Sequence, residues 1–284
     1  DLKAIRSRRT FLSKLAAVLA VGATAGIWAE PGEMGLEHAS VRAALAKQKA
    51  VTPAVMKLPG VLGTAIGDDE QGGAEVIIYV NQRHPAAATL PAPAGTRIEF
   101  TDEFVALAGK PSGGSAVSHT AKQTAPIQLG TSGGWRSDLA NGYCCGGTLG
   151  SLVQVNGVQY ILSNYHVLEA DIVLGGNSLI AGTGDAVIQP GLIDVSCNAA
   201  SAQNVATLVK TGSLPLYNVD VGLAQVTPGM VRADGAILEI GTISSQTVAA
   251  SLNKAVKKSG RTSGLTRSKL SGLNATSNIT YENE

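Results

Sequence analysis

The dipeptide Asn156-Gly157 constrains the fold most strongly, because it joins two runs of alternating apolar residues. These runs are 146–155 (GGTLGSLVQV) and 158–162 (VQYIL). Asn-Gly between such runs favours a two-residue turn whose backbone twist matches that of paired antiparallel strands. The sequence therefore predicts a β-hairpin at this position.

Short runs of the same kind continue through the rest of the chain, with no long helical pattern between them. The 284 residues include 34 glycines, and only 4% of them are aromatic. Regularly spaced short strands with tight turns are typical of antiparallel barrels or sandwiches. We therefore expect a mainly β fold. The further predicted strands are 185–190, 204–212, 219–226, 236–243, 255–260 and 268–283.

An earlier segment, 36–107, has a different pattern and predicts a small α/β domain. Val41, Ala44 and Leu45 lie on one face of an expected helix over 36–50, and Pro53 is expected to end it. The domain shows no nucleophile, ligand cluster or phosphate loop, so a scaffold, a propeptide or a docking domain are its expected roles. Three extended runs follow the helix: 61–67, 74–80 and 96–107.

Residues 108–134 are rich in Gly, Ser, Thr and Pro, which is the composition of a linker. We interpret His119 within this linker, and His84 before it, as solvated side chains. The segment 135–284 is then expected to form the main β domain.

The first 29 residues resemble a twin-arginine export signal. Arg8 and Arg9 precede an apolar segment, 15–29, that is shorter than the roughly 20 residues needed to span a bilayer. Cleavage after Ala25 or Ala29 would deliver a periplasmic or secreted protein with no stable membrane insertion. The alternative is a basic amphipathic N-terminus that stays attached.

Three cysteines fit an exported protein better than a metal site, because Cys144 and Cys145 are adjacent and Cys197 is distant. We expect one disulfide between Cys197 and either member of the pair.

The charge balance gives no reason to expect a nucleic-acid partner, since 22 Lys and Arg face 21 Asp and Glu. One local basic cluster lacks interleaved aromatics, and we interpret it as a solvated barrel face. Its members are Lys257, Lys258, Arg261, Arg267 and Lys269.

His166 is the first candidate site residue, because the strand ending at Ser163-Asn164 can bring it to the rim of a barrel. Asp220 lies 54 positions later among apolar neighbours, where a carboxylate needs a hydrogen-bond partner. An imidazole is such a partner, and the pair would suit general-base catalysis. The alternative is an Asp in a turn after Asn218, solvated or capping a backbone amide.

Four ordered motifs resemble the trypsin-like serine peptidases of the chymotrypsin fold, in a bacterial branch similar to the plant narrow-leaf type proteins. The likeness covers roughly Gly146 to Tyr281, and 58–67 with 75–80 resemble the region before it. The four motifs are Gly-Thr-Leu-Gly from Gly147, Ser-Asn-Tyr-His-Val from Ser163, Val219-Asp220, and Lys-Ser-Gly-Arg-Thr-Ser-Gly-Leu-Thr from Lys258.

This resemblance implies a double β-barrel and a serine endopeptidase that needs no metal or organic cofactor and acts on a protein or peptide. His166 matches the general base of the family and Asp220 its orienting acid. Gly222 stands where the family usually has Ala, a change expected to be harmless.

The Gly-Asp-Ser-Gly nucleophile motif is absent, and Ser259 and Ser263 come too soon after Asp220 to replace it. We therefore expect a truncated second barrel and a chain that is inactive alone. The alternative function is a non-catalytic barrel that binds peptides or a partner protein.

Overall fold

The computed structural model describes residues 32–106, 117–140, 143–170, 178–209, 212–214 and 216–281. Within them the chain is mainly β, with few helices, and its contacts divide it into two compact units. The predicted export signal, 1–29, lies outside the described residues, as do 108–116 of the predicted linker. None of the helices described here is both long and apolar enough to cross a membrane.

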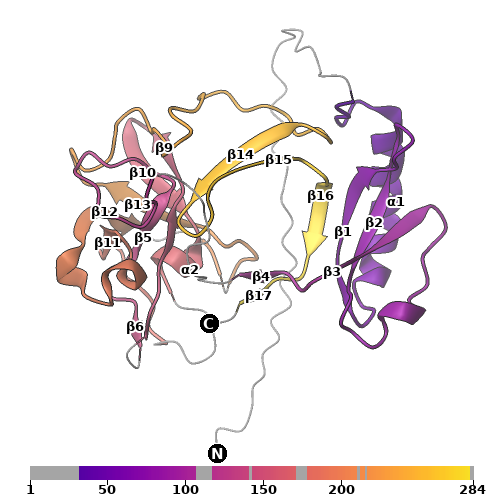
Figure 1. The fold of residues 1–284 in the computed structure, drawn as a ribbon, viewed down its shortest axis with the longest axis horizontal. Helices are drawn as coiled ribbons and strands as arrows, with labels where there is room; N and C mark the ends of the chain where they lie inside the picture. The colour runs from indigo at the N-terminus through magenta and orange to yellow at the C-terminus, as the bar shows by residue number, and fades with distance from the viewer. Residues whose placement is uncertain are drawn as a thin grey trace, which may run out of the picture. The chain divides into compact units, whose positions relative to one another are not determined.

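The N-terminal unit is a four-stranded sheet with one helix packed on it (Figure 1). The strand order is β16-β1-β2-β3, in which β1 pairs antiparallel with β16 and β2, and β2 pairs parallel with β3. The elements are α1 (Ala39–Val55), β1 (Val61–Asp68), β2 (Ala74–Asn81), η1 (Ala87–Thr89), β3 (Thr96–Thr101) and β16 (Leu273–Ser277).

Helix α1 is longer than the sequence predicted. It continues through Pro53 and ends at Val55, because Val41, Ala44, Gln48 and Val55 form one buried stripe. Burial of Val55 extends the apolar face by one turn beyond the predicted end, so the proline lies in the last turn instead of ending the helix.

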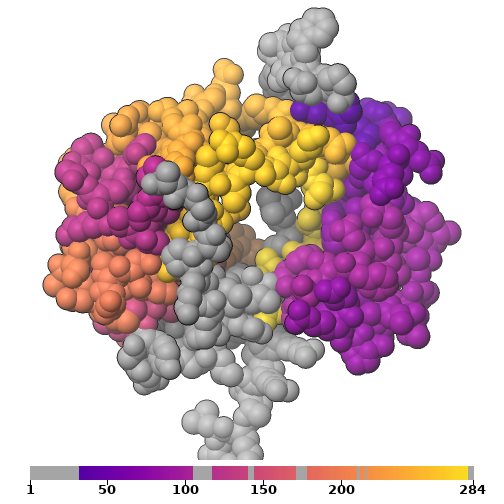
Figure 2. Space-filling model, viewed as in Figure 1, coloured from indigo at the N-terminus to yellow at the C-terminus, as the bar shows by residue number. Residues whose placement is uncertain are grey.

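Strand β16 shows that the N-terminal unit is built from both parts of the chain. Residues Thr247–Val256 and Ser268–Thr280 cluster with 32–106, whereas the predicted domain 135–284 placed them with the β domain. Figure 2 shows the yellow C-terminal atoms against the indigo and purple atoms of this unit. The predicted boundary failed here because the pairing partner of β16 lies some 200 residues earlier, where local patterns carry no information.

Two hydrogen bonds between Gln48 and Asn274 fix β16 against α1. Gln48 Nε2 donates to the backbone oxygen of Asn274 at 2.8 Å, and Asn274 Nδ2 donates to Gln48 Oε1 at 2.8 Å. Gln48 is almost fully buried, so these bonds supply the partners that a buried amide requires.

We predict that Gly63→Ala destabilises the N-terminal unit by about 1–3 kcal/mol, as overpacking typically does. A Cβ at Gly63 would lie 2.5 Å from the backbone oxygen of Thr276 in β16, and backbone cannot move aside cheaply. Chemical denaturation measures the loss, and amide exchange should locate it at residues 273–277. The control is Gly182→Ala, whose Cβ would meet nothing within 4 Å. Equal stability of the two variants would contradict the pairing.

The second unit, called the β unit below, contains a curled antiparallel seven-stranded sheet (Figure 1). Its strand order is β8-β5-β11-β12-β13-β10-β9. The strands are β5 (Thr131–Trp135), β8 (Gly147–Leu149), β9 (Ser151–Val155), β10 (Val158–Ser163), β11 (Ala186–Gln189), β12 (Gln203–Val209) and β13 (Gly222–Val226).

The predicted hairpin is confirmed. Strands β9 and β10 pair antiparallel with Val155 opposite Val158. Asn156 and Gly157 both have positive φ, 50° and 82°, as the favoured two-residue turn requires. This turn leads the chain directly into the strand that precedes His166.

Strand β5 corrects the linker prediction. Residues 131–135 are buried, and the small side chains of 131–134 permit close packing, since a Cβ at Gly133 would lie 2.4 Å from the Leu149 side chain. Gln189, buried in β11, holds the preceding residues by donating to Ala121 O at 2.8 Å and accepting from Gln123 N at 3.0 Å. The small residues that suggested a linker are therefore needed here for close packing of a buried strand.

The predicted strand at 236–243 is wrong, because these residues form turns and isolated bridges. Glu239 and Gly241 have φ of 62° and 90°, left-handed values that interrupt an extended backbone. The remaining elements are short: β4 (Val105–Ala106) with β17 (Thr280–Tyr281), β6 (Leu139–Ala140) with β7 (Tyr143–Cys144), β14 (Ala255–Gly260) with β15 (Gly264–Lys269), α2 (Tyr165–Leu168), η2 (Leu192–Val195) and η3 (Ala199–Ser201).

Candidate active site

His166 lies on α2, the four-residue helix that follows β10. Tyr165, Val167 and Leu168 are buried, whereas the His166 side chain keeps 31% of its surface exposed. The helix therefore anchors itself through three apolar side chains and places the imidazole at the surface. This arrangement explains how an apolar strand can end in an accessible histidine.

Glycines let α2 lie close to the sheet. A Cβ at Gly147 in β8 would lie 2.5 Å from Val167 Cγ2. A Cβ at Gly222 in β13 would lie 3.0 Å from Asn164 O and 3.1 Å from Leu168 Cβ. Gly222 is thus in a tight position, and the alanine usual in the family would require its neighbours in this chain to move by a few tenths of an ångström.

Asp220 lies just before β13, beside His166. His166 Nδ1 is 2.6 Å from Asp220 Oδ2, and the backbone N–H of His166 donates to Asp220 Oδ1 at 3.3 Å. The Asp220 side chain is 18% exposed. Both carboxylate oxygens therefore contact His166, and one of them has the imidazole partner that the sequence predicted.

This geometry assigns the proton on the ring. A carboxylate can only accept hydrogen bonds, so Nδ1 is the donor to Asp220, and in a neutral imidazole Nε2 is then the acceptor nitrogen. A base held in this tautomer can take a proton from a hydroxyl and be stabilised as imidazolium by the adjacent carboxylate. The pair can therefore perform general-base chemistry.

The predicted disulfide is confirmed and its partner is now defined. Cys144 in β7 bonds to Cys197, with their Cα atoms 5.5 Å apart. The bridge joins β7 to the segment between η2 and η3 in the β unit.

A second histidine, His119, is buried, whereas the sequence analysis interpreted it as a solvated side chain. Its side chain is only 3% exposed, with Nδ1 2.9 Å from Gly130 O and Nε2 2.7 Å from Glu239 Oε2. Ser259 Oγ lies 3.4 Å from the same Nδ1. Nδ1 lies closer to the Gly130 carbonyl oxygen, which can only accept, than to Ser259 Oγ, so this ring nitrogen faces a backbone acceptor in preference to the hydroxyl. This Ser-His-Glu cluster resembles a catalytic triad in composition, but its ring is oriented for a structural role.

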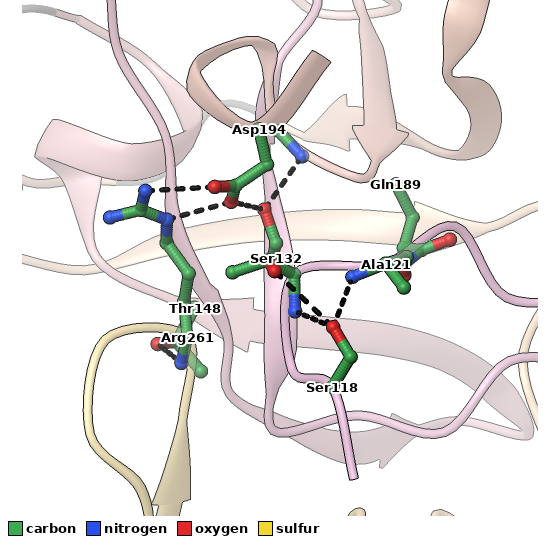
Figure 3. A network of polar contacts seen from close by, with 9 residues as sticks. Ser118, Ala121, Ser132, Thr148, Gln189, Asp194 and Arg261 are labelled. Carbon is green, nitrogen blue, oxygen red and sulfur yellow. Dashed lines mark hydrogen bonds and ion pairs between the residues drawn. The ribbon is translucent and has the colours of Figure 1, made fainter. Parts of the chain in front are cut away.

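Arg261 also differs from its prediction, because it is buried and not part of a solvated face. Figure 3 shows its guanidinium directed at Asp194, with Nε 2.7 Å from Oδ2 and an Nη nitrogen 2.9 Å from Oδ1. Asp194 Oδ2 also accepts from Ser132 Oγ at 2.5 Å, and Thr148 Oγ1 accepts from the Arg261 backbone at 3.0 Å. This network fixes the turn between β14 and β15 onto the β unit. The other four basic residues are largely or partly exposed.

Within the described part of the chain, no group of three or more His, Cys, Asp or Glu side chains could hold a metal ion. Neither a scan of protein-family models nor a search of curated proteins gives a match to this chain. The arrangement of His166 and Asp220 is therefore the observation on which a function can be argued.

Proposed function

We propose that this protein is a serine-type endopeptidase in which His166 is the general base and Asp220 the acid that orients it. The observation that carries the proposal is the 2.6 Å contact between Nδ1 and Oδ2, reinforced by the backbone bond from His166 to the same carboxylate. The curled antiparallel sheet supports the proposal, because it is compatible with the first barrel of a chymotrypsin-like fold.

The reaction would follow the usual course of such a pair. A serine hydroxyl attacks the peptide carbonyl while Nε2 of His166 takes the hydroxyl proton, and the same nitrogen then returns the proton to the leaving amine. Asp220 stabilises the imidazolium between the two steps. Backbone N–H groups near the serine would stabilise the oxyanion, and no metal or organic cofactor takes part.

We do not assign the nucleophilic role to Ser259 or Ser263. Ser259 contacts His119, and Ser263 Oγ accepts a hydrogen bond from Lys258 Nζ. The test is to treat the complete gene product with a fluorophosphonate, which reacts with activated serines, and to locate the label by mass spectrometry. We expect a labelled serine other than these two. A label on Ser259 would move the active site to the His119 cluster and contradict the proposal.

The proposed substrate is a protein or peptide, and export would place the enzyme in the periplasm or outside the cell. The precursor in which Arg8 and Arg9 are both replaced by Lys should then remain in the cytoplasm, since the export receptor reads the arginine pair. Unchanged export of that precursor would remove this part of the proposal.

A further inference from the structure

The orientation of Asp220 depends on the two peptide groups that flank its Cα, and Ser213 contacts both. Ser213 Oγ donates to the carbonyl oxygen of Val219 and accepts from the N–H of Val221, the latter at 3.1 Å. The hydroxyl thus donates to the peptide group before Asp220 and accepts from the peptide group after it. The residue is 4% exposed, so water does not compete readily for these bonds.

The peptide after Asp220 is also held from its other side. Asn164 Nδ2 donates to the carbonyl oxygen of Asp220 at 3.0 Å. The N–H of that peptide therefore contacts Ser213, while its C=O contacts Asn164, the residue just before α2. Asn164 joins the Asp220 backbone to the start of the helix that carries His166.

We propose that Ser213 and Asn164 are positioning residues that set the alignment of the Asp220 carboxylate with the His166 ring. This inference rests on the proposed function, since it concerns the same pair. Neither residue would touch the substrate or the reacting atoms. Each acts by fixing a peptide plane, and through it the direction of the carboxylate.

A purely structural role for Ser213, closing its own loop, is a weaker explanation. Two backbone bonds already close that loop, from Leu214 N to Val219 O at 3.0 Å and from Tyr217 N to Ser213 O at 3.1 Å. Loss of the hydroxyl leaves both bonds in place. The contacts that it removes are those at the peptides flanking Asp220.

The experiment uses proton NMR of the 284-residue chain, in which the Nδ1 proton shared with a carboxylate gives a strongly downfield resonance. We expect this signal in the wild-type protein, and we expect Ser213→Ala to shift it upfield or abolish it while the far-UV circular dichroism stays unchanged. Asn164→Ala removes the other contact at an exposed position, so it should fold normally and shift the signal in the same direction.

The matched control is Ser132→Ala. Ser132 is also a buried serine that donates one bond, to Asp194, and accepts one, from Gly191 N. This variant should lower the melting temperature but leave the downfield resonance in place. An unchanged resonance in folded Ser213→Ala and in Asn164→Ala, or an equal loss in Ser132→Ala, would overturn the inference.

Hydrolysis by the complete gene product gives an independent readout. Small misplacements of catalytic groups cost up to about a hundredfold in rate, so Ser213→Ala should lower kcat by about ten- to a hundredfold with KM unchanged. If the wild-type protein shows no hydrolysis but the resonance responds as expected, the positioning role stands and the peptidase proposal fails. If hydrolysis occurs and kcat is unchanged in both variants, the positioning role fails alone.

Discussion

Asp220→Asn is expected to lower the kcat for protein hydrolysis by about four orders of magnitude, the loss seen when this acid is replaced in such a triad. An asparagine amide can donate to His166 Nδ1, which favours the tautomer whose proton lies on Nε2. That ring cannot accept the proton of a nucleophile. The side chains are nearly equal in size, so the fold should persist.

The measurement is the kcat of the complete gene product on a fluorescently labelled protein substrate. Asp234→Asn is the control, because Asp234 pairs with Arg232 at the surface and lies outside the proposed site. It should hydrolyse the substrate at the wild-type rate. A loss of only a few-fold in Asp220→Asn would show that this carboxylate does not orient a catalytic base.

Arg261→Gln is expected to destabilise the β unit by about 3–5 kcal/mol, the usual cost of breaking a buried ion pair by removing one partner. The Arg261 and Asp194 side chains are 4% and 9% exposed, and the substitution would leave the Asp194 carboxylate buried without its cation. Urea denaturation followed by circular dichroism measures the loss.

Arg232→Gln provides the comparison. Arg232 bonds to Asp234 in the same forked manner and holds the pKa of that carboxyl below its ordinary value, but both side chains are close to half exposed. Water replaces such a pair readily, so the urea midpoint should hardly change. Equal midpoints for Arg261→Gln and Arg232→Gln would contradict the structural role of the buried network.

The features that the sequence predicted correctly depend on neighbouring residues. Asn156-Gly157 specifies a turn by itself, and the alternating run before Ser163 specifies the strand that leads to His166. The pairing of His166 with Asp220 followed from the cost of burying a carboxylate without a partner. Each of these arguments needs only a few adjacent residues and a general physical rule.

The features that the sequence did not predict depend on contacts with residues far away along the chain. Arg261 is buried because Asp194, 67 positions earlier, accepts its guanidinium, and nothing in the local basic run indicates this. His119 lies in a stretch with the composition of a linker, and its partner Glu239 is 120 positions away. Strand β16 pairs with β1, and most of the β unit lies between the two strands in the sequence. Local patterns therefore could not assign β16 to the N-terminal unit.

The central claim, that Asp220 acts on catalysis through His166, is tested most directly by comparing kcat for His166→Ala, Asp220→Asn and the double variant. Residues that act as a unit are strongly non-additive, because the orienting acid has no role once the base is gone. We predict that the double variant has the same residual kcat as His166→Ala alone. Losses that multiply in the double variant would contradict the claim.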